Sequence, residues 1–256
     1  VVILGGVSRI ASVTEKVVPF MGIFYLIGAF FVIGCDLNAL PGAFREIFEG
    51  AFGWQQAAGG FSGALLARAM HFGVARGVFS NEAGLGSASI VHAAADTDSA
   101  VKQGFWGMFE VFADTIVVCT VTALAILVSG AMDSGLTGVE LSQAAFEHAM
   151  GNPGGWFLAA SICLFAFATI VSWAYYGEQC GEYLFGKRIL LPYKILYILA
   201  VAVGAGMKLE LVWDISDTLN GLMAVPNLIA LAALSGIVMK LTREYLREHP
   251  LKRGRK

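Results

Sequence analysis

Long apolar segments separated by polar connections make up most of the sequence. An α-helix needs roughly 20 apolar residues to cross about 30 Å of hydrocarbon. We expect membrane spans at residues 17–34, 54–74, 104–130, 155–177, 190–207 and 212–241, all within a transmembrane region of residues 1–239. Their unbroken apolar character favours helices over the short alternating strands of a β-barrel. The pattern predicts an all-α integral membrane protein with about six transmembrane helices.

The composition supports this class and excludes others. Of the 256 residues, 57% are hydrophobic and 14% are charged, and the mean hydropathy is +0.71. Soluble domains carry about 25% charged residues. These values exclude a soluble enzyme and a nucleic-acid binder, since a net charge of −2 offers no positive field for phosphate. The sequence contains neither the His spacing of a metal site nor a nucleophile motif, so we expect no enzyme and no cofactor.

The basic residues predict an orientation. All 17 Lys and Arg residues except Arg45 and Lys208 fall on one side of a six-span arrangement, Arg76 among them. Cytoplasmic connections carry such an excess. We therefore expect a multi-pass protein of the plasma (inner) membrane, with residues 240–256 as a basic cytoplasmic tail. Asp217 is expected at the opposite, outer end of the last span.

The second expected span is interrupted by Gly59, Gly60 and Gly63. Each glycine lowers helix stability by roughly 1 kcal/mol relative to alanine. Irregular backbone at membrane depth is tolerated only where it is buried in protein or lines a wet cavity. Glycine-interrupted segments of this kind indicate a transporter binding site. Two interpretations are open: an unwound stretch that binds a solute, or a small-residue face for close helix packing.

Polar residues within two other spans are candidates for binding. Asp114 lies about one turn after Glu110 on the same helix face, and an ionised carboxylate at this depth costs several kcal/mol unless it is paired or hydrated. It either bridges neighbouring helices or belongs to a cation or proton site. Thr169 and Trp173 share a face of the fourth span. They either pack within the protein or offer a hydroxyl to Na⁺ and an indole N–H to a small ligand.

Several stretches resemble the alanine or glycine:cation symporter family, the sodium:alanine symporters. These stretches are residues 9–20, 59–63, 73–87, 106–115, 172–178 and 211–223. The resemblance covers nearly the whole chain, and residues 74–87 form its longest distinctive run.

The resemblance implies a leucine-transporter-like fold of two inverted five-helix repeats around a central site. The chain would hold only the last helix of repeat one and the whole of repeat two, without the N-terminal half of the transporter. It implies two sets of site residues. The substrate-binding set is Gly59, Gly60, Phe61, Leu65, Thr169 and Trp173, and the Na⁺ set is Phe165, Ala168, Thr169 and Asp114.

The implied function is cation-coupled symport, with Na⁺ as the coupling ion, of a small neutral amino acid such as alanine or glycine. The expected partners are that amino acid, Na⁺ or H⁺, and the lipid bilayer. The sequence does not decide whether the coupling ion is Na⁺ or H⁺, or whether the substrate is alanine or glycine. Because the first repeat is not in the sequence, the alternative is a truncated, transport-inactive membrane fragment or an assembly partner.

Overall fold

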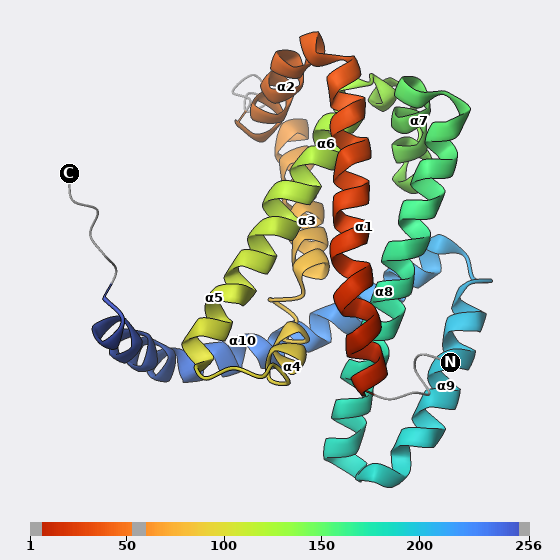
Figure 1. Cartoon of the computed structure of the whole chain (residues 1–256). Coiled ribbons are helices and arrows are strands. Elements are labelled where there is room, and N and C mark those ends of the chain that lie inside the picture. The colour runs from red at the N-terminus through yellow and green to blue at the C-terminus, as the bar shows by residue number, and fades with distance from the viewer. Residues whose placement is uncertain (1–6, 53–59, 251–256) are drawn as a thin grey trace. The chain divides into compact units, whose positions relative to one another are not determined.

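The computed structural model describes the backbone of residues 7–52 and 60–250, and their side chains except those of residues 7–9, 11, 52 and 60–66. Its longer helices are α1 (Val7–Cys35), α2 (Leu40–Phe52), α3 (Gly60–Asn81), α5 (Ala100–Val111), α6 (Cys119–Val128), α7 (Gly138–Met150), α8 (Asn152–Phe185), α9 (Leu190–Gly204) and α10 (Leu209–Glu248) (Figure 1). Short elements link them: η2 (Leu37–Ala39), α4 (Ala88–His92), the π-helix η4 (Phe112–Val118), η5 (Ala131–Ser134) and η6 (Lys187–Ile189). The predicted all-α class is confirmed for the described residues.

Four of the expected spans coincide with helical segments that are long and apolar enough to cross a membrane. They are Ser12–Cys35, Ala100–Val128, Asn152–Phe185 and Leu209–Glu248. The other two expected spans, residues 54–74 and 190–207, fall on α3 and α9, which are not among these four segments. Helix α3 carries Arg68, His71 and Arg76, and α9 has 15 residues, or about 22 Å at 1.5 Å per residue. The total of six crossings and the inverted-repeat arrangement therefore stay predictions.

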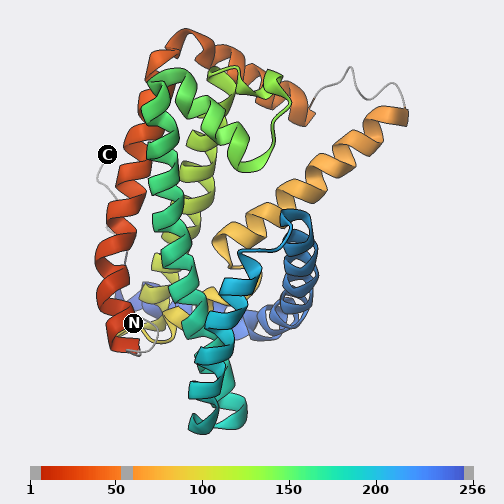
Figure 2. The same cartoon turned by 90° about the vertical axis from the view of Figure 1, so that its right-hand side faces the viewer.

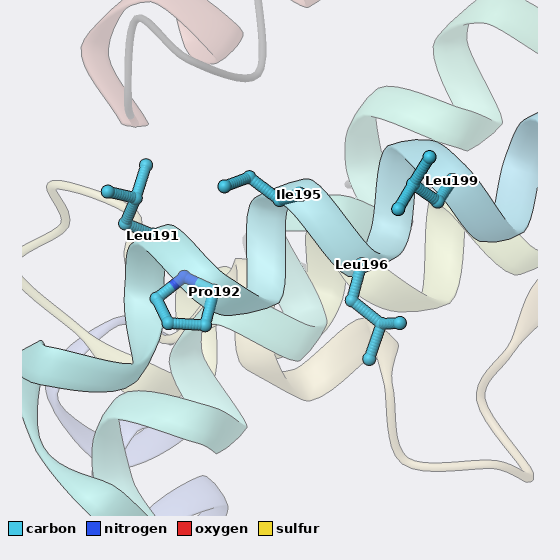
Figure 3. A pocket seen from close by; sticks show the side chains of 5 residues that line it. All are labelled: Leu191, Pro192, Ile195, Leu196 and Leu199. Carbon is cyan, nitrogen blue, oxygen red and sulfur yellow. The ribbon is translucent and has the colours of Figure 1, made fainter.

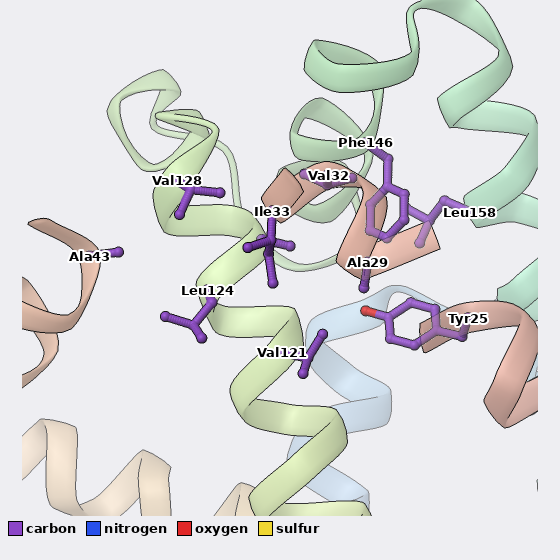
Figure 4. Packing of buried hydrophobic residues seen from close by; sticks show 11 residues of the cluster. Tyr25, Ala29, Val32, Ile33, Ala43, Val121, Leu124, Val128, Phe146 and Leu158 are labelled. Carbon is purple, nitrogen blue, oxygen red and sulfur yellow. The ribbon is translucent and has the colours of Figure 1, made fainter. Parts of the chain in front are cut away.

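The chain divides into two compact units. Unit 1 consists of Val1–Phe72 and Ile116–Gly206, and unit 2 of Gly73–Thr115 and Met207–Lys256. In unit 1, α1 and α8 lie side by side (Figures 1 and 2). The buried cluster of this unit comes from α1, α2, α6, α7 and α8 and comprises Tyr25, Ala29, Val32, Ile33, Ala43, Val121, Leu124, Ala125, Val128, Phe146 and Leu158 (Figure 4).

Two details show how closely the helices of unit 1 approach. Gly28 of α1 lies against the ring of Phe157 from α8, and any side chain at residue 28 would collide with that ring. Tyr25 shares a hydrogen bond with Thr122 of α6, with 2.7 Å between the two hydroxyl oxygens. A small residue at the crossing and a satisfied hydroxyl pair are what packed membrane helices require.

Helices α8 and α9 form an antiparallel hairpin (Figure 2), which turns at Gly186 with φ +73°. Lys194 of α9 forms an ion pair with Glu178 of α8, 3.2 Å between Nζ and Oε2, and both side chains are largely buried. Tyr197 donates a hydrogen bond to the carbonyl of Ile170 at 2.8 Å. These polar contacts fix how α9 lies along α8.

In unit 2, α5 begins after a capped turn. The Ser99 hydroxyl accepts a hydrogen bond from the backbone N–H of Lys102, which satisfies one of the free donors at the start of the helix. The ammonium of Lys102 also lies 3.2 Å from Asp98 Oδ1, and this hydrogen bond lowers the pKa of Asp98. The helix then runs without interruption through η4 into α6.

Candidate functional site

A break in helical structure interrupts the distinctive 74–87 run. Helix α3 ends at Asn81 and the chain becomes helical again only at Ala88 (Figure 1). Within the break, Glu82 has φ +57° and Gly86 has φ +82°, and Glu82 is the one non-glycine residue with positive φ among those described. The left-handed region is unfavourable for most side chains, and such residues cluster at functional sites. The break is therefore the strongest local candidate for a binding element.

Asn81 explains why the helix ends at this point. Its side-chain amide donates to the carbonyl of Gly77 at 2.8 Å, and its Oδ1 accepts from the backbone N–H of Ala83 at 3.1 Å. Such local bonds offer the backbone an alternative to the helical pattern. The N–H of Gly86 then donates to the Glu82 carbonyl at 3.1 Å, which closes the turn.

The position of the break corrects an expectation. Unwinding was one of the two interpretations open for Gly59, Gly60 and Gly63, but α3 begins at Gly60 and continues through Gly63. Unwinding is therefore wrong for these two residues, while Gly59 lies outside the described residues. Each glycine lowers the stability of a helix by roughly 1 kcal/mol relative to alanine, which weakens the helix without ending it. The end of α3 is set by Asn81 and by the left-handed turn that follows.

An oxygen-rich cluster lies at the upstream end of the break. Ser80 donates to Asp114 Oδ2 at 2.6 Å, and the hydroxyl of Thr115 donates to the same oxygen at 3.3 Å. The amide of Asn81 donates to the Thr115 hydroxyl at 3.0 Å. Hard cations prefer carboxylate, hydroxyl and carbonyl oxygens. The cluster has the ligand types of a small-cation site, and it also forms the interhelical bridge that was the alternative for Asp114.

The backbone of η4 is itself unusual. Residues 112–118 form a π-helix within an otherwise α-helical segment, and Asp114 and Thr115 both lie in it. Single π-turns are uncommon and occur frequently at functional sites, because the extra residue re-aims the side chains around it. The sequence indicated Asp114 through its depth in the membrane. It gave no signal for the contribution of Ser80, Asn81 and Thr115, which only the contacts reveal.

Asn227 of α10 also forms hydrogen bonds with the backbone of the break. Its amide donates to the carbonyls of Ala83 and Gly84, at 3.1 and 3.0 Å. A Cβ on Gly86 would lie 2.7 Å from Asn227 Oδ1, so this glycine is required for space as well as for φ. Backbone carbonyls that leave the helical pattern need such partners. Within the break, Ser87 is 2% exposed and donates to Glu82 Oε2 at 2.9 Å.

Arg76 links the end of α3 to α10. Its guanidinium forms two hydrogen bonds with Asp217 of α10, at 2.8 and 2.9 Å, and lies 4.0 Å from the ring centroid of Trp213. Residues paired this closely cannot face opposite sides of about 30 Å of hydrocarbon. The expected placement of Arg76 on the side opposite to Asp217 is therefore wrong.

The other predicted site residues are distributed differently. On α8 in unit 1, Phe165 packs edge-on against Tyr25 with ring centroids 5.5 Å apart, and Ala168 is buried, so this helix face is covered by α1. Thr169 is exposed and Trp173 is half-buried. The predicted residues Gly60, Phe61 and Leu65 lie in the first part of α3, where only the backbone is described.

An apolar groove on α9 is a poor alternative site. It is lined by Leu191, Pro192, Ile195, Leu196 and Leu199 (Figure 3). These side chains offer no hydrogen-bonding group to a zwitterion, whereas lipid tails would match them. Among the described residues, no group of three or more His, Cys, Asp or Glu could hold a metal ion. The polar break in unit 2 is therefore the better candidate for a binding site.

Comparisons with a family profile and with individual proteins point to the same family. The profile of the sodium:alanine symporter family matches residues 1–256. The chain is 44% identical over 248 residues to the "Sodium/alanine symporter AgcS" of Methanococcus maripaludis, covering 95% of this chain and 54% of that protein. It is 42% identical to the "Probable sodium/glutamine symporter GlnT" of Bacillus subtilis, covering 96% of this chain and 51% of that protein. The chain thus spans about half the length of the curated relatives it matches.

Proposed function

The chain belongs to the sodium:alanine symporter family, and from that premise we propose that it forms the break-bearing half of a cation-coupled amino-acid symporter. In this proposal Na⁺ is the coupling ion and the substrate is a small neutral amino acid such as alanine or glycine. The protein would act in the plasma membrane with its C-terminus in the cytoplasm.

One observation carries the proposal: a helix break in unit 2 adjoins the cluster formed by Ser80, Asn81, Asp114 and Thr115. Unwound main chain in transporters offers carbonyls to a cation and N–H groups to a carboxylate. Asp114 supplies the negative charge that a bound cation needs, and its neighbours supply neutral oxygens. A zwitterion and a cation bound close together each favour the binding of the other, and that mutual coupling is what symport requires.

The substrate is proposed on chemistry and on the relatives together. Relatives of similar identity are named for sodium/alanine and for sodium/glutamine symport, and a 34% identical one is named a "Putative sodium/proton-dependent alanine carrier protein". All of these names describe a neutral amino acid coupled to a cation. We keep Phe61, Leu65, Thr169 and Trp173 as proposed substrate contacts, with Phe165 and Ala168 as proposed contributors to a Na⁺ site on α8.

A direct experiment measures uptake of labelled alanine into proteoliposomes that contain this chain, with an inward Na⁺ gradient or an equal K⁺ gradient. Competition by glycine and glutamine then ranks the substrates. Na⁺-dependent uptake supports the proposal. Binding of Na⁺ without uptake favours the alternative of a transport-inactive assembly partner. Absence of both contradicts the proposal.

A further inference from the structure

The downstream end of the break is attached to α5 through His92, the last residue of α4. The Nε2 atom of Gln103 lies 2.7 Å from His92 Nδ1, and His92 Nε2 lies 3.1 Å from Glu110 Oε2. The ring also rests on Gly107, where a Cβ would lie 3.2 Å from Nε2. The imidazole therefore occupies a notch on one face of α5, between two polar side chains.

The same helical segment holds both ends of the break. Gln103, Gly107 and Glu110 are spaced so that they share a face of α5. Asp114 comes about one turn later and accepts the hydrogen bond from Ser80, at the end of α3. The α5–η4 segment thus contacts the chain just before and just after the break. The distance between its two contact points fixes the separation of α3 and α4.

The hydrogen-bonding roles of the two ring nitrogens of His92 follow from the amide orientation of Gln103. The amide nitrogen of Gln103 only donates, so with this amide orientation Nδ1 is the acceptor and Nε2 carries the hydrogen that faces Glu110. Glu110 is the titratable side chain that faces His92 among the described residues of α5, the helix against which α4 packs.

We propose that His92 is a positioning residue for the cation cluster. It holds the downstream end of the break on α5 and so keeps the chain around Glu82 in register with Asp114. The proposal rests on the proposed function in that the positioned cluster binds the coupling cation. It assigns His92 no contact with that cation.

Hydrogen exchange of this chain in nanodiscs tests the proposal without any transport. His92→Ala should speed exchange about tenfold, both for the backbone amides of α4 and for those of Leu85 and Gly86 within the break. His92→Gln can donate to Glu110 and accept from Gln103, so it should restore most of the protection. Faster exchange confined to α4, or unchanged exchange throughout, would overturn the positioning role.

A second measurement addresses function. In an active preparation, His92→Ala should raise the half-saturating Na⁺ concentration about fivefold while changing the maximal rate less. Gly107→Ala displaces the ring without removing it and should shift the same parameters in the same direction. His148→Ala, which removes an imidazole paired with Asp36 in unit 1, is the matched control. Equal Na⁺ dependence in His92→Ala and His148→Ala contradicts the proposal. If no variant transports, the exchange result alone decides.

Discussion

Gly86 and Asn227 fit together so closely that neither can change without disturbing the other. Gly86 adopts φ +82°, and a Cβ on it would approach Asn227 Oδ1 to 2.7 Å. The amide nitrogen of Asn227 donates hydrogen bonds to the carbonyls of Ala83 and Gly84. A side chain on α10 therefore stabilises the turn between α3 and α4. This pairing explains why an asparagine lies within the apolar part of α10.

Replacing Gly86 by alanine should destabilise unit 2 by about 1–3 kcal/mol, because the variant must adopt a left-handed conformation and collides with Asn227. Thermal unfolding in detergent measures this change. Gly104→Ala is the matched control, since Gly104 is helical and its Cβ would meet nothing within 4 Å. That control should be neutral or slightly stabilising. Equal effects of the two substitutions would mean that Gly86 is not held in the conformation described.

Asn227→Ala leaves the carbonyls of Ala83 and Gly84 without their side-chain donor. The expected cost is about 1–3 kcal/mol of stability, with faster hydrogen exchange at the break. Ser235→Ala serves as the control on the same helix, because the Ser235 hydroxyl bonds only to its own helix at Ala232. Unchanged exchange at Leu85 and Gly86 in Asn227→Ala would show that these carbonyls do not depend on Asn227.

The pair formed by Arg76 and Asp217 should show measurable coupling. Exposed ion pairs usually contribute about 0.2–1 kcal/mol, and two hydrogen bonds together with stacking on Trp213 place this one near the upper end. A double-mutant cycle with Arg76→Gln and Asp217→Asn measures the coupling energy by thermal unfolding. Asp214→Asn removes a nearby exposed carboxylate and should leave Arg76 unaffected. A coupling energy of zero would argue against the pairing, and with it against placing both residues on one side of the membrane.

The buried pair of Glu178 and Lys194 should behave differently from the exposed one. Glu178 Oε1 is buried and has no hydrogen-bond partner among the described residues, so the pair is incompletely satisfied. Lys194→Met alone leaves a buried carboxylate and should cost about 3–5 kcal/mol, whereas the double substitution Glu178→Leu with Lys194→Met should recover most of this stability. Lys187→Met, at an exposed residue of η6, is the control. No recovery in the double variant would indicate that the pair itself, rather than its charge balance, holds the hairpin.

Much of the fold is predictable from sequence because lipid imposes simple rules. Apolar length located α1, α5–α6, α8 and α10 as candidate membrane spans. Glycine content does not locate the break, because the side-chain hydrogen bonds of Asn81 and the left-handed Glu82 end the helix. Contacts between distant segments have no local signature. Nothing near Arg76 in sequence indicates Asp217, and nothing near Asp114 indicates Ser80. The charge-based orientation failed at Arg76 for the same reason, since a basic residue paired within the protein no longer reports the side of the membrane.

In the proposed function, the oxygen cluster beside the break binds the coupling cation. Equilibrium binding of radioactive Na⁺ to the purified chain tests it most directly, with Asp114→Asn compared against Asp133→Asn, an exposed carboxylate in η5. We expect saturable binding that weakens at least about tenfold in Asp114→Asn, because this substitution removes the negative charge of the cluster, and that is unchanged in Asp133→Asn. Equal Na⁺ affinity in both variants would contradict it.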